Sequence, residues 1–178
     1  MEEKEILRSQ CRAQAKACPL ESLAICQRIL QLSVYQNAKS VLAFYPMKTE
    51  PDIRPVLEAC LQAGKQLYLP QTDEMLQIHP RQVCDLRQLR RGRFGIWEPE
   101  ESQPEEKNIS VILVPALAYD RQLYRLGQGA GCYDRFLPES SGVRIGVCFD
   151  AFLMDQIPHD SHDQPVHILC TQSQTIVK

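Results

Sequence analysis

The sequence has 178 residues, of which 44 % are hydrophobic and 24 % are charged, values typical of one soluble globular domain. The formal net charge of −2 argues against general binding to nucleic acid or acidic membranes, so anion binding requires a local group of basic side chains. No apolar run approaches the roughly 20 residues that span a bilayer, and the charged start MEEKEILR lacks the apolar core of a secretory signal. We therefore expect a single cytoplasmic domain over residues 1–178.

Two helices and a strand are predicted at the start of the chain. Residues 2–17 are rich in Glu, Lys, Arg, Gln and Ala, which favour helix. Pro19 interrupts this segment and suits the first turn of a second helix, which fades near Leu32. The apolar segment 40–45 is closed by Pro46 and is typical of a buried strand.

The following segments alternate between helix, strand and loop. A helix is predicted over 55–63 with Gly64 as its C-cap, and a strand over 66–69 is predicted to stop at Pro70. A further short strand is expected over 76–79. Two loops are expected after it, the first basic and the second acidic and exposed: 87–93 and 98–107.

Three strand-like segments fill the second half of the chain: 109–114, 144–149 and 166–170. The first is continuously apolar and mostly β-branched, as expected for a parallel strand covered on both faces. Strands alternating with helices indicate an α/β fold, a single three-layer domain with a mainly parallel central sheet flanked by helices. Ligands in such domains bind beyond the carboxyl ends of the strands. Three loops are therefore the expected places for a site, those after Tyr45, Val114 and Phe149.

The eight cysteines are many for this length, but they form no CxxC pair, so a zinc ribbon or a thioredoxin-type site is not expected. Without an export signal the thiols are expected to stay reduced. Those in apolar segments are predicted to be small core residues, with a redox role as the alternative: Cys26, Cys148 and Cys170.

The segment 125–134, RLGQGAGCYD, carries three alternating glycines and leads into a short helix predicted over 133–137. Glycines let the backbone approach a phosphate, and successive N–H groups at a helix N-terminus attract anions. Arg125 and Arg135 add positive charge, and Asp134 is a candidate magnesium ligand. The segment is not a P-loop, because no Gly-Lys-Ser/Thr follows, and it is not a dinucleotide fingerprint. A plain glycine-rich turn is the alternative.

A longer pattern extends beyond the glycines. VPALAYD at 114–120 is followed by RLGQGAGCYDRFL at 125–137. Further landmarks follow in order along nearly the whole chain: KEILR at 4–8, FYPM at 44–47 with Glu50 and Asp52, FGIWEP at 94–99, and IPHDSHD at 157–163 with Thr171. Together these segments resemble the 5-formyltetrahydrofolate cyclo-ligase family, which typically has VPGLAFD followed by RLGxGxGYYDRFL.

The resemblance implies a reaction and its ligands. In that family, ATP activates the N5-formyl oxygen of 5-formyltetrahydrofolate as an iminophosphate, N10 attacks the activated carbon, and 5,10-methenyltetrahydrofolate forms with release of ADP and phosphate. ATP and Mg²⁺ are therefore the implied cofactors. The implied partner is a reduced folate, with or without a polyglutamate tail, and no nucleic acid or membrane. We expect a monomer.

The resemblance also implies site residues. The ATP contacts match two cations on one face of the first helix and the glycine-rich segment: Lys4, Arg8, Arg125, Leu126, Gly127, Gln128, Gly129, Ala130, Gly131, Cys132 and Tyr133. The folate contacts match an early segment, the tryptophan and part of the same loop: Met47, Glu50, Asp52, Trp97, Gln128, Gly129, Ala130, Gly131 and Cys132. Arg125 and Tyr133 are the implied catalytic residues, and Asp134 and Asp163 the implied magnesium ligands.

Some of these residues are also consistent with ordinary structural roles. Trp97 suits stacking on folate and core packing equally well. His159, His162 and Asp163 have the residue types of a metal site, but two histidines without a third firm ligand favour an ordinary loop. Lys4 and Arg8 would also suit a solvated basic helix face.

The chain departs from the family pattern at several positions: Ala116, Leu123, Gln128, Ala130 and Cys132. Leu123 stands where a glycine allows a turn that leucine resists. The Cys132 thiol, in a basic and exposed loop, is predicted to have a lowered pKa and to mediate inhibition by thiol reagents. We expect an active cyclo-ligase. The alternatives are a non-catalytic folate- or nucleotide-binding member of the family, and a sugar-phosphate or acyl-transfer enzyme on a related scaffold.

Overall fold

The computed structural model describes residues 2–16, 18–160 and 163–178. Its centre is a seven-stranded sheet in the order β12-β11-β9-β6-β1-β2-β3. The five inner strands are parallel, and the edge strands β3 and β12 run antiparallel to their neighbours, which confirms the predicted, mainly parallel sheet. The strand bounds are β1 Ser40–Leu42, β2 Gln66–Thr72, β3 Ile78–Val83, β6 Val111–Pro115, β9 Val143–Val147, β11 Ile168–Cys170 and β12 Thr175–Val177.

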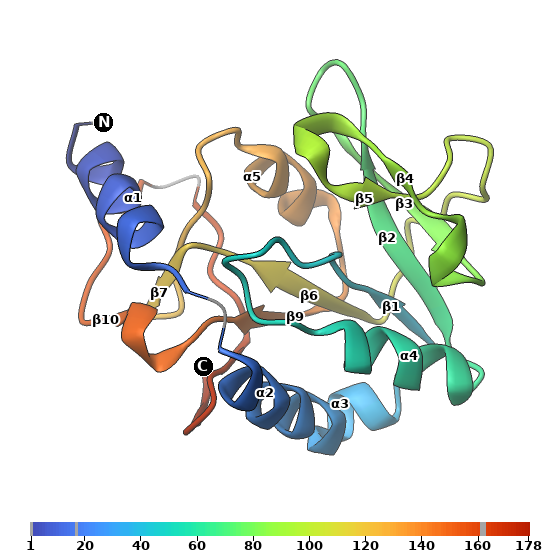
Figure 1. The fold of residues 1–178 in the computed structure, drawn as a ribbon, viewed down its shortest axis with the longest axis horizontal. Helices are drawn as coiled ribbons and strands as arrows, with labels where there is room; N and C mark the ends of the chain where they lie inside the picture. Colours follow the sequence, from blue (N-terminus) through green and yellow to red (C-terminus); the bar gives the residue numbers. More distant parts are fainter. Residues whose placement is uncertain (1, 17, 161–162) are drawn as a thin grey trace.

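Helices cover both faces of this sheet, which confirms the three-layer α/β architecture (Figure 1). α2, α3 and α4 lie together on one face, α5 lies on the other, and α1 stands apart from the first group. The helix bounds are α1 Glu2–Gln14, α2 Pro19–Gln31, α3 Ser33–Gln36, α4 Arg54–Gln62 and α5 Cys132–Phe136. Four short 3-10 helices complete the described helical segments: η1 Leu86–Gln88, η2 Arg93–Gly95, η3 Leu137–Glu139 and η4 Asp150–Phe152. No helix in these described ranges is long and apolar enough to cross a membrane.

Alternate side chains of β6 fill two separate parts of the core. Val111 and Leu113 pack in the cluster that includes α2 and α4, whereas Ile112 and Val114 pack in the cluster on the α5 side. All four are buried, and each such side chain stabilises the fold by roughly 1.5–3 kcal/mol. Burial on both faces explains why this central strand is an unbroken apolar run.

The second strand of the chain differs from its prediction. β2 continues through Pro70 to Thr72, so the prediction that this proline stops the strand is wrong. β1 pairs only with residues 66–68, so at Pro70 the single neighbour is β3, where Pro80 lies opposite. Proline lacks the N–H that a central strand must donate, and here no second strand requires it.

Several boundaries also differ. α1 ends at Gln14, earlier than predicted, and β1 ends at Leu42, after which the chain to Tyr45 belongs to no strand. The C-cap of α4 is Ala63, and Gly64 directly after it has a φ of +69°, so the glycine ends the helix as predicted but lies one residue beyond the cap. Glu98 is buried and belongs to a strand, so the acidic segment is not exposed along its whole length.

Two small sheets were not indicated by the sequence. One has the order β10-β7-β8 and the other pairs β4 with β5. Their strands have two or three residues each, too few for a pattern of alternating side chains. The bounds are β4 Arg90–Arg91, β5 Trp97–Glu98, β7 Ala118–Asp120, β8 Arg125–Leu126 and β10 Leu153–Met154.

Candidate active site

The loops after β1, β6 and β9 meet at the carboxyl edge of the sheet, where parallel α/β folds bind ligands. Glu50 follows β1, Leu117 follows β6, and Phe149 follows β9, and all three line one narrow pocket. α1 closes this pocket with Cys11. The structure therefore brings together the three loops that the strand pattern singled out.

The glycine-rich loop connects β8 to α5 and takes a conformation that requires glycine at two positions. Gly129 has a φ of +105° and Gly131 a φ of +70°, values that side chains rarely permit. A Cβ on Gly131 would also lie 2.9 Å from Nη1 of Arg135. The guanidinium of Arg135 holds the loop by donating to the carbonyl of Ala130 over 2.9 Å. The loop is thus held in one backbone conformation by its glycines and by Arg135.

α1 docks on this loop through its basic side chains. Nε of Arg8 donates to the carbonyl of Gly127 over 3.0 Å, and Nη2 of Arg12 donates to the carbonyl of Gln128 over 3.0 Å. One turn earlier, Nζ of Lys4 lies 2.8 Å from Oδ2 of Asp163. Lys4 and Arg8 therefore contact the site, and the interpretation as a solvated helix face is wrong.

The charge on Lys4 is held by its partners. Burial lowers its pKa, but the hydrogen bonds from Asp163 and Asp160 outweigh burial, so the pKa of Lys4 is raised overall. The ammonium group therefore stays protonated and paired with these two carboxylates.

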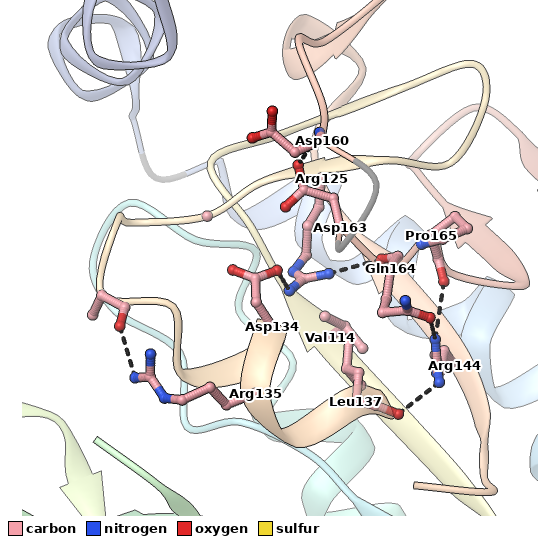
Figure 2. A network of polar contacts seen from close by, with 12 residues as sticks. Val114, Arg125, Asp134, Arg135, Leu137, Arg144, Asp160, Asp163, Gln164 and Pro165 are labelled. Atoms are coloured by element: carbon pink, nitrogen blue, oxygen red, sulfur yellow. Dashed lines mark hydrogen bonds and ion pairs between the residues drawn. The ribbon is translucent and has the colours of Figure 1, made fainter. Parts of the chain in front are cut away.

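Arg125 occupies the centre of a polar network (Figure 2). Only 5 % of its side chain is exposed. Nη1 donates to the carbonyl of Gln164 over 2.8 Å, and Nη2 pairs with the Asp134 carboxylate on α5. Beyond Gln164, the guanidinium of Arg144 donates from Nη1 to the Gln164 side-chain oxygen over 3.3 Å and from Nη2 to the carbonyl of Leu137 over 2.6 Å.

Tyr133 and Glu50 provide two polar groups that the protein leaves incompletely satisfied. The hydroxyl of Tyr133 is buried and has no hydrogen-bond partner among the described residues. Burial and the nearby Glu50 carboxylate raise the pKa of Tyr133 far above its usual range, which keeps it a neutral donor. Burial raises the pKa of Glu50 to about 7, although the main-chain N–H of Met47 donates to this carboxylate over 2.9 Å and lowers the pKa. A buried hydroxyl without a partner costs free energy, so it indicates a position for a ligand.

Asp134 and Asp163 are the two carboxylates that the resemblance implied as magnesium ligands, and each pairs with a cation of the site, Asp134 with Arg125 and Asp163 with Lys4. They come from α5 and from the segment before β11, and Figure 2 shows both beside Arg125. Within the described ranges no three His, Cys, Asp or Glu residues group as a metal cluster. Magnesium is commonly held by one or two carboxylates plus substrate phosphates and water. Carboxylates are therefore residues of the type that suits that ion when phosphates supply further oxygens.

The remaining metal candidates lie in the loop before Asp163. His159 stacks on the ring of Tyr124 with centroids 3.7 Å apart, which fits the expected loop. His162 lies outside the described residues.

Two of the residues matched to folate contacts, Trp97 and Asp52, contact neighbouring side chains of the protein. Trp97 is 37 % exposed, so the core interpretation is wrong. Its ring meets Tyr45 edge-on at 6.5 Å and lies under the Arg91 guanidinium at 4.4 Å. Asp52 pairs with Arg54, whose hydrogen bond lowers the pKa of this carboxyl. Asp52 is thus occupied by a neighbour, while Trp97 remains partly exposed.

Cys132 is not the exposed, acidic thiol that its loop suggested. It is the first residue of α5 and is partly buried. Burial raises the pKa of this thiol, and the lowering effect of Arg135 is smaller. The prediction of a lowered pKa is therefore wrong, because burial outweighs the nearby positive charge.

A thiol reagent is consequently expected to find another target first. Cys84 is exposed, so iodoacetamide at pH 8 should label Cys84 faster than Cys132, as followed by mass spectrometry of peptides over time. A Cys84→Ser variant should lose the fast phase. Faster labelling of Cys132 than of Cys84 would contradict the effect of burial on this thiol.

Leu123 adopts the turn that its position demands. Its φ is +71°, and its N–H donates to the carbonyl of Asp120 over 3.0 Å, so the left-handed turn forms without glycine. The left-handed conformation costs a leucine roughly 1–2 kcal/mol. The side chain is 2 % exposed and packs in the core cluster on the α5 side, and burial of that size offsets the cost.

The two effects can be separated by a pair of variants. Leu123→Ala and Leu123→Gly both lose the buried side chain and should destabilise the protein by about 2–5 kcal/mol. The glycine variant should nevertheless be more stable than the alanine variant by about 1 kcal/mol, because only alanine retains the left-handed penalty. Urea denaturation measures this difference. Leu137 is the control position, because it is fully buried but has an ordinary φ of −63°. There the alanine variant should be more stable than the glycine variant. An alanine preference at both positions would contradict the argument.

Two residues of the site were not identified from the sequence: Arg144 and Gln164. For Arg144, the available signal was a charged residue at the start of the segment RIGVCF, which is otherwise free of charge, since a buried strand rarely carries an arginine without a specific partner. Gln164 gave no signal, because its importance comes from the two arginines that it joins.

A three-layer α/β fold with a basic, glycine-rich site at the carboxyl edge of the sheet is the arrangement of α/β proteins that bind small anionic ligands. Comparisons with known proteins define the family. The sequence model described as the 5-formyltetrahydrofolate cyclo-ligase family matches residues 2–172. The 5-formyltetrahydrofolate cyclo-ligase of Mycolicibacterium smegmatis is 35 % identical over 150 residues, covering 79 % of this chain and 77 % of the relative. The probable 5-formyltetrahydrofolate cyclo-ligase of Schizosaccharomyces pombe is 26 % identical over 88 % of this chain and 86 % of its own.

Solved structures agree with the sequence relatives. The 5,10-methenyltetrahydrofolate synthetase of Aquifex aeolicus has a TM-score of 0.86 and 28 % identity, covering 98 % of this chain and 92 % of that chain. A 5,10-methenyltetrahydrofolate synthetase from Mycoplasma pneumoniae has a TM-score of 0.76 at 17 % identity, over 96 % of this chain and 99 % of that chain, and supports the fold alone. The chain belongs to the 5-formyltetrahydrofolate cyclo-ligase family. It is therefore an enzyme, a cyclo-ligase of folate chemistry, as the resemblance implied.

Proposed function

We propose that the enzyme converts 5-formyltetrahydrofolate to 5,10-methenyltetrahydrofolate in an ATP-dependent reaction that releases ADP and phosphate. The observation that carries this proposal is the docking of α1, which brings Arg8 onto the glycine-rich loop and Lys4 onto Asp163, next to Gln164, whose carbonyl accepts from Arg125. Cations from distant segments at one loop suit a polyphosphate, since the chain as a whole has a net charge of −2. We further propose that the protein acts as a cytoplasmic monomer.

The protein's own contribution is positioning and charge stabilisation. The backbone of the loop from Gly127 to Gly131 cradles the phosphates, and the fork of Arg125 faces the transferred phosphoryl group. The formyl oxygen attacks the terminal phosphate of ATP and displaces ADP. N10 then attacks the activated carbon and gives up its proton to the departing phosphate, and the bond from that carbon to the phosphate oxygen breaks. Tyr133 donates its unpaired hydroxyl to the folate side of this centre.

The folate occupies the neighbouring part of the carboxyl edge. Trp97 and Tyr45 offer aromatic cover for a flat ring, and the apolar side chain of Met47 lies in the same early segment. Glu50, with a pKa of about 7, is able to donate or accept a hydrogen bond with a ring N–H or N near neutral pH.

Asp134 and Asp163 would hold magnesium, which when bound neutralises phosphate charge and screens the developing negative charge. Asp134→Ala is expected to abolish turnover with magnesium and ATP, because it removes a metal ligand and also the carboxylate that holds Arg125. Steady-state rates at saturating folate measure the loss. Glu139→Ala, in the adjacent exposed turn, is the control and should retain full activity. Near-normal turnover of Asp134→Ala would remove Asp134 from the metal site.

The reaction itself is tested by mixing the purified protein with 5-formyltetrahydrofolate, magnesium and ATP and following the absorbance of methenyltetrahydrofolate. A sample without ATP is the control. Product that forms only with ATP supports the proposal. Product without ATP would refute ATP dependence, and folate binding without any product would favour the non-catalytic alternative.

A further inference from the structure

Arg144 is a half-buried cation whose partners in the structure are all neutral. It is the second residue of β9, and its guanidinium donates to the carbonyl of Leu137, to the side-chain oxygen of Gln164 and, at 3.5 Å, to the carbonyl of Pro165. No ion pair joins it to a carboxylate among the described residues. Burial and the like charge of Arg125 lower the pKa of Arg144. Burying a charge without a counter-ion costs free energy, so an arginine at this position indicates a specific role for its guanidinium.

The guanidinium of Arg144 contacts both of the segments that hold Arg125. Arg125 is held on one side by the main-chain carbonyl of Gln164 and on the other by the Asp134 carboxylate of α5. Arg144 donates to the side-chain oxygen of Gln164 and so holds that residue. It also donates to the carbonyl of Leu137, directly after α5, and so holds the helix that carries Asp134 (Figure 2). Gln164 therefore joins the two arginines, using its main chain for one and its side chain for the other.

We propose that Arg144 and Gln164 are positioning residues that fix the direction of the Arg125 guanidinium. The functional consequence rests on the proposed function, in which Arg125 faces a phosphate. A planar guanidinium with donors in a rigid fork can hold Leu137 and Gln164 simultaneously, whereas a lysine offers a single ammonium group. Neither residue touches the ligand in this arrangement; both act through Arg125. In metal sites, loss of the outer contacts that orient a ligand residue typically costs 10- to 100-fold in affinity or activity, and we expect a loss of similar size here in the binding of ATP.

The first test reads the position of Arg125 directly and does not depend on activity. In protein labelled with ¹⁵N-arginine, hindered rotation of a guanidinium held on both sides gives separate Nη signals. Arg125 should show separate signals in the wild-type protein and a single averaged signal in Arg144→Met and in Arg144→Lys. Gln164→Leu is the second variant, used if Arg144→Met does not fold. It keeps the main-chain carbonyl that holds Arg125 but removes the side-chain link to Arg144. It should therefore give partial averaging of the Arg125 signals. Unchanged Arg125 signals in a folded variant would overturn the proposal.

The second test measures the dissociation constant of ATP by calorimetry without turnover. Arg144→Met should weaken ATP binding about 10- to 100-fold and leave the affinity for 5-formyltetrahydrofolate unchanged. The matched control is Arg28→Met, because Arg28 on α2 also donates to two main-chain carbonyls, those of Gln172 and Ser173, and neither belongs to the glycine-rich loop. Equal effects of the two variants on ATP affinity would reduce Arg144 to a general structural role and overturn the proposal. A wild-type protein that does not bind ATP would refute the proposed function, while the arginine signals would still decide the positioning role.

Discussion

Replacing Arg125 with lysine is expected to lower kcat/KM for ATP by about 100-fold or more. Lysine preserves the charge but not the two donors that reach Gln164 and Asp134 at once. Loss of one preorganised donor at a site of developing charge commonly costs 10²- to 10³-fold in rate. Initial rates over a range of ATP concentrations, at saturating folate, give this ratio.

The control for this variant is Arg121→Lys. Arg121 is 60 % exposed, and its guanidinium reaches the fully exposed Asp155 over 3.4 Å, a contact of little energetic value. It should keep wild-type kinetics. A loss of less than about threefold in Arg125→Lys would show that only the positive charge at this position matters, and the fork geometry would then have no catalytic role.

The fold was largely predictable because the segments that form it carry local patterns. The unbroken apolar segment that became β6 indicated its central position, and Gly64 marked the end of α4 through a conformation that glycine permits. Pro70 misled the prediction, because a proline stops a strand only where its missing N–H faces a second neighbour. Whether β2 has that neighbour depends on the length of β1, which is a property of the sheet and not of the segment.

The residues of the site were likewise predictable where they carry a local sequence pattern and not where their role depends on the folded chain. The glycine-rich loop was visible because glycines at alternate positions are uncommon outside tight turns and ligand-binding loops, and α1 was linked to it through the family resemblance. Arg144 and Gln164 carry no local pattern, since their importance arises where β9, α5 and the segment before β11 meet. Cys132 shows the opposite error: its neighbours in sequence are basic, but burial in the folded chain has the larger effect on its thiol.

Glu50 carries a consequence for stability that only the folded structure reveals. Its pKa rises from an ordinary value of 4.5 to about 7, chiefly because of burial. Below about pH 4.5 the carboxyl is protonated in both the folded and the unfolded chain and contributes no difference. Between pH 4.5 and 7 the unfolded chain loses this proton while the folded protein retains it, so the free energy of unfolding falls as pH rises. Above pH 7 the cost is constant, at roughly 3 kcal/mol for a shift of this size.

Glu50→Gln should therefore stabilise the protein at alkaline pH, since glutamine resembles the protonated carboxyl and can still accept the hydrogen bond from the Met47 N–H. The difference in free energy of unfolding between the variant and the wild-type protein should grow by roughly 2–3 kcal/mol from pH 5 to pH 8. Urea denaturation at the two pH values measures it. Glu58→Gln, at an exposed position on α4, is the control and should show no such growth. A pH-independent difference for Glu50→Gln would mean that this carboxylate is stabilised by contacts that compensate for its burial, and Glu50 would then enter the reaction already ionised at neutral pH.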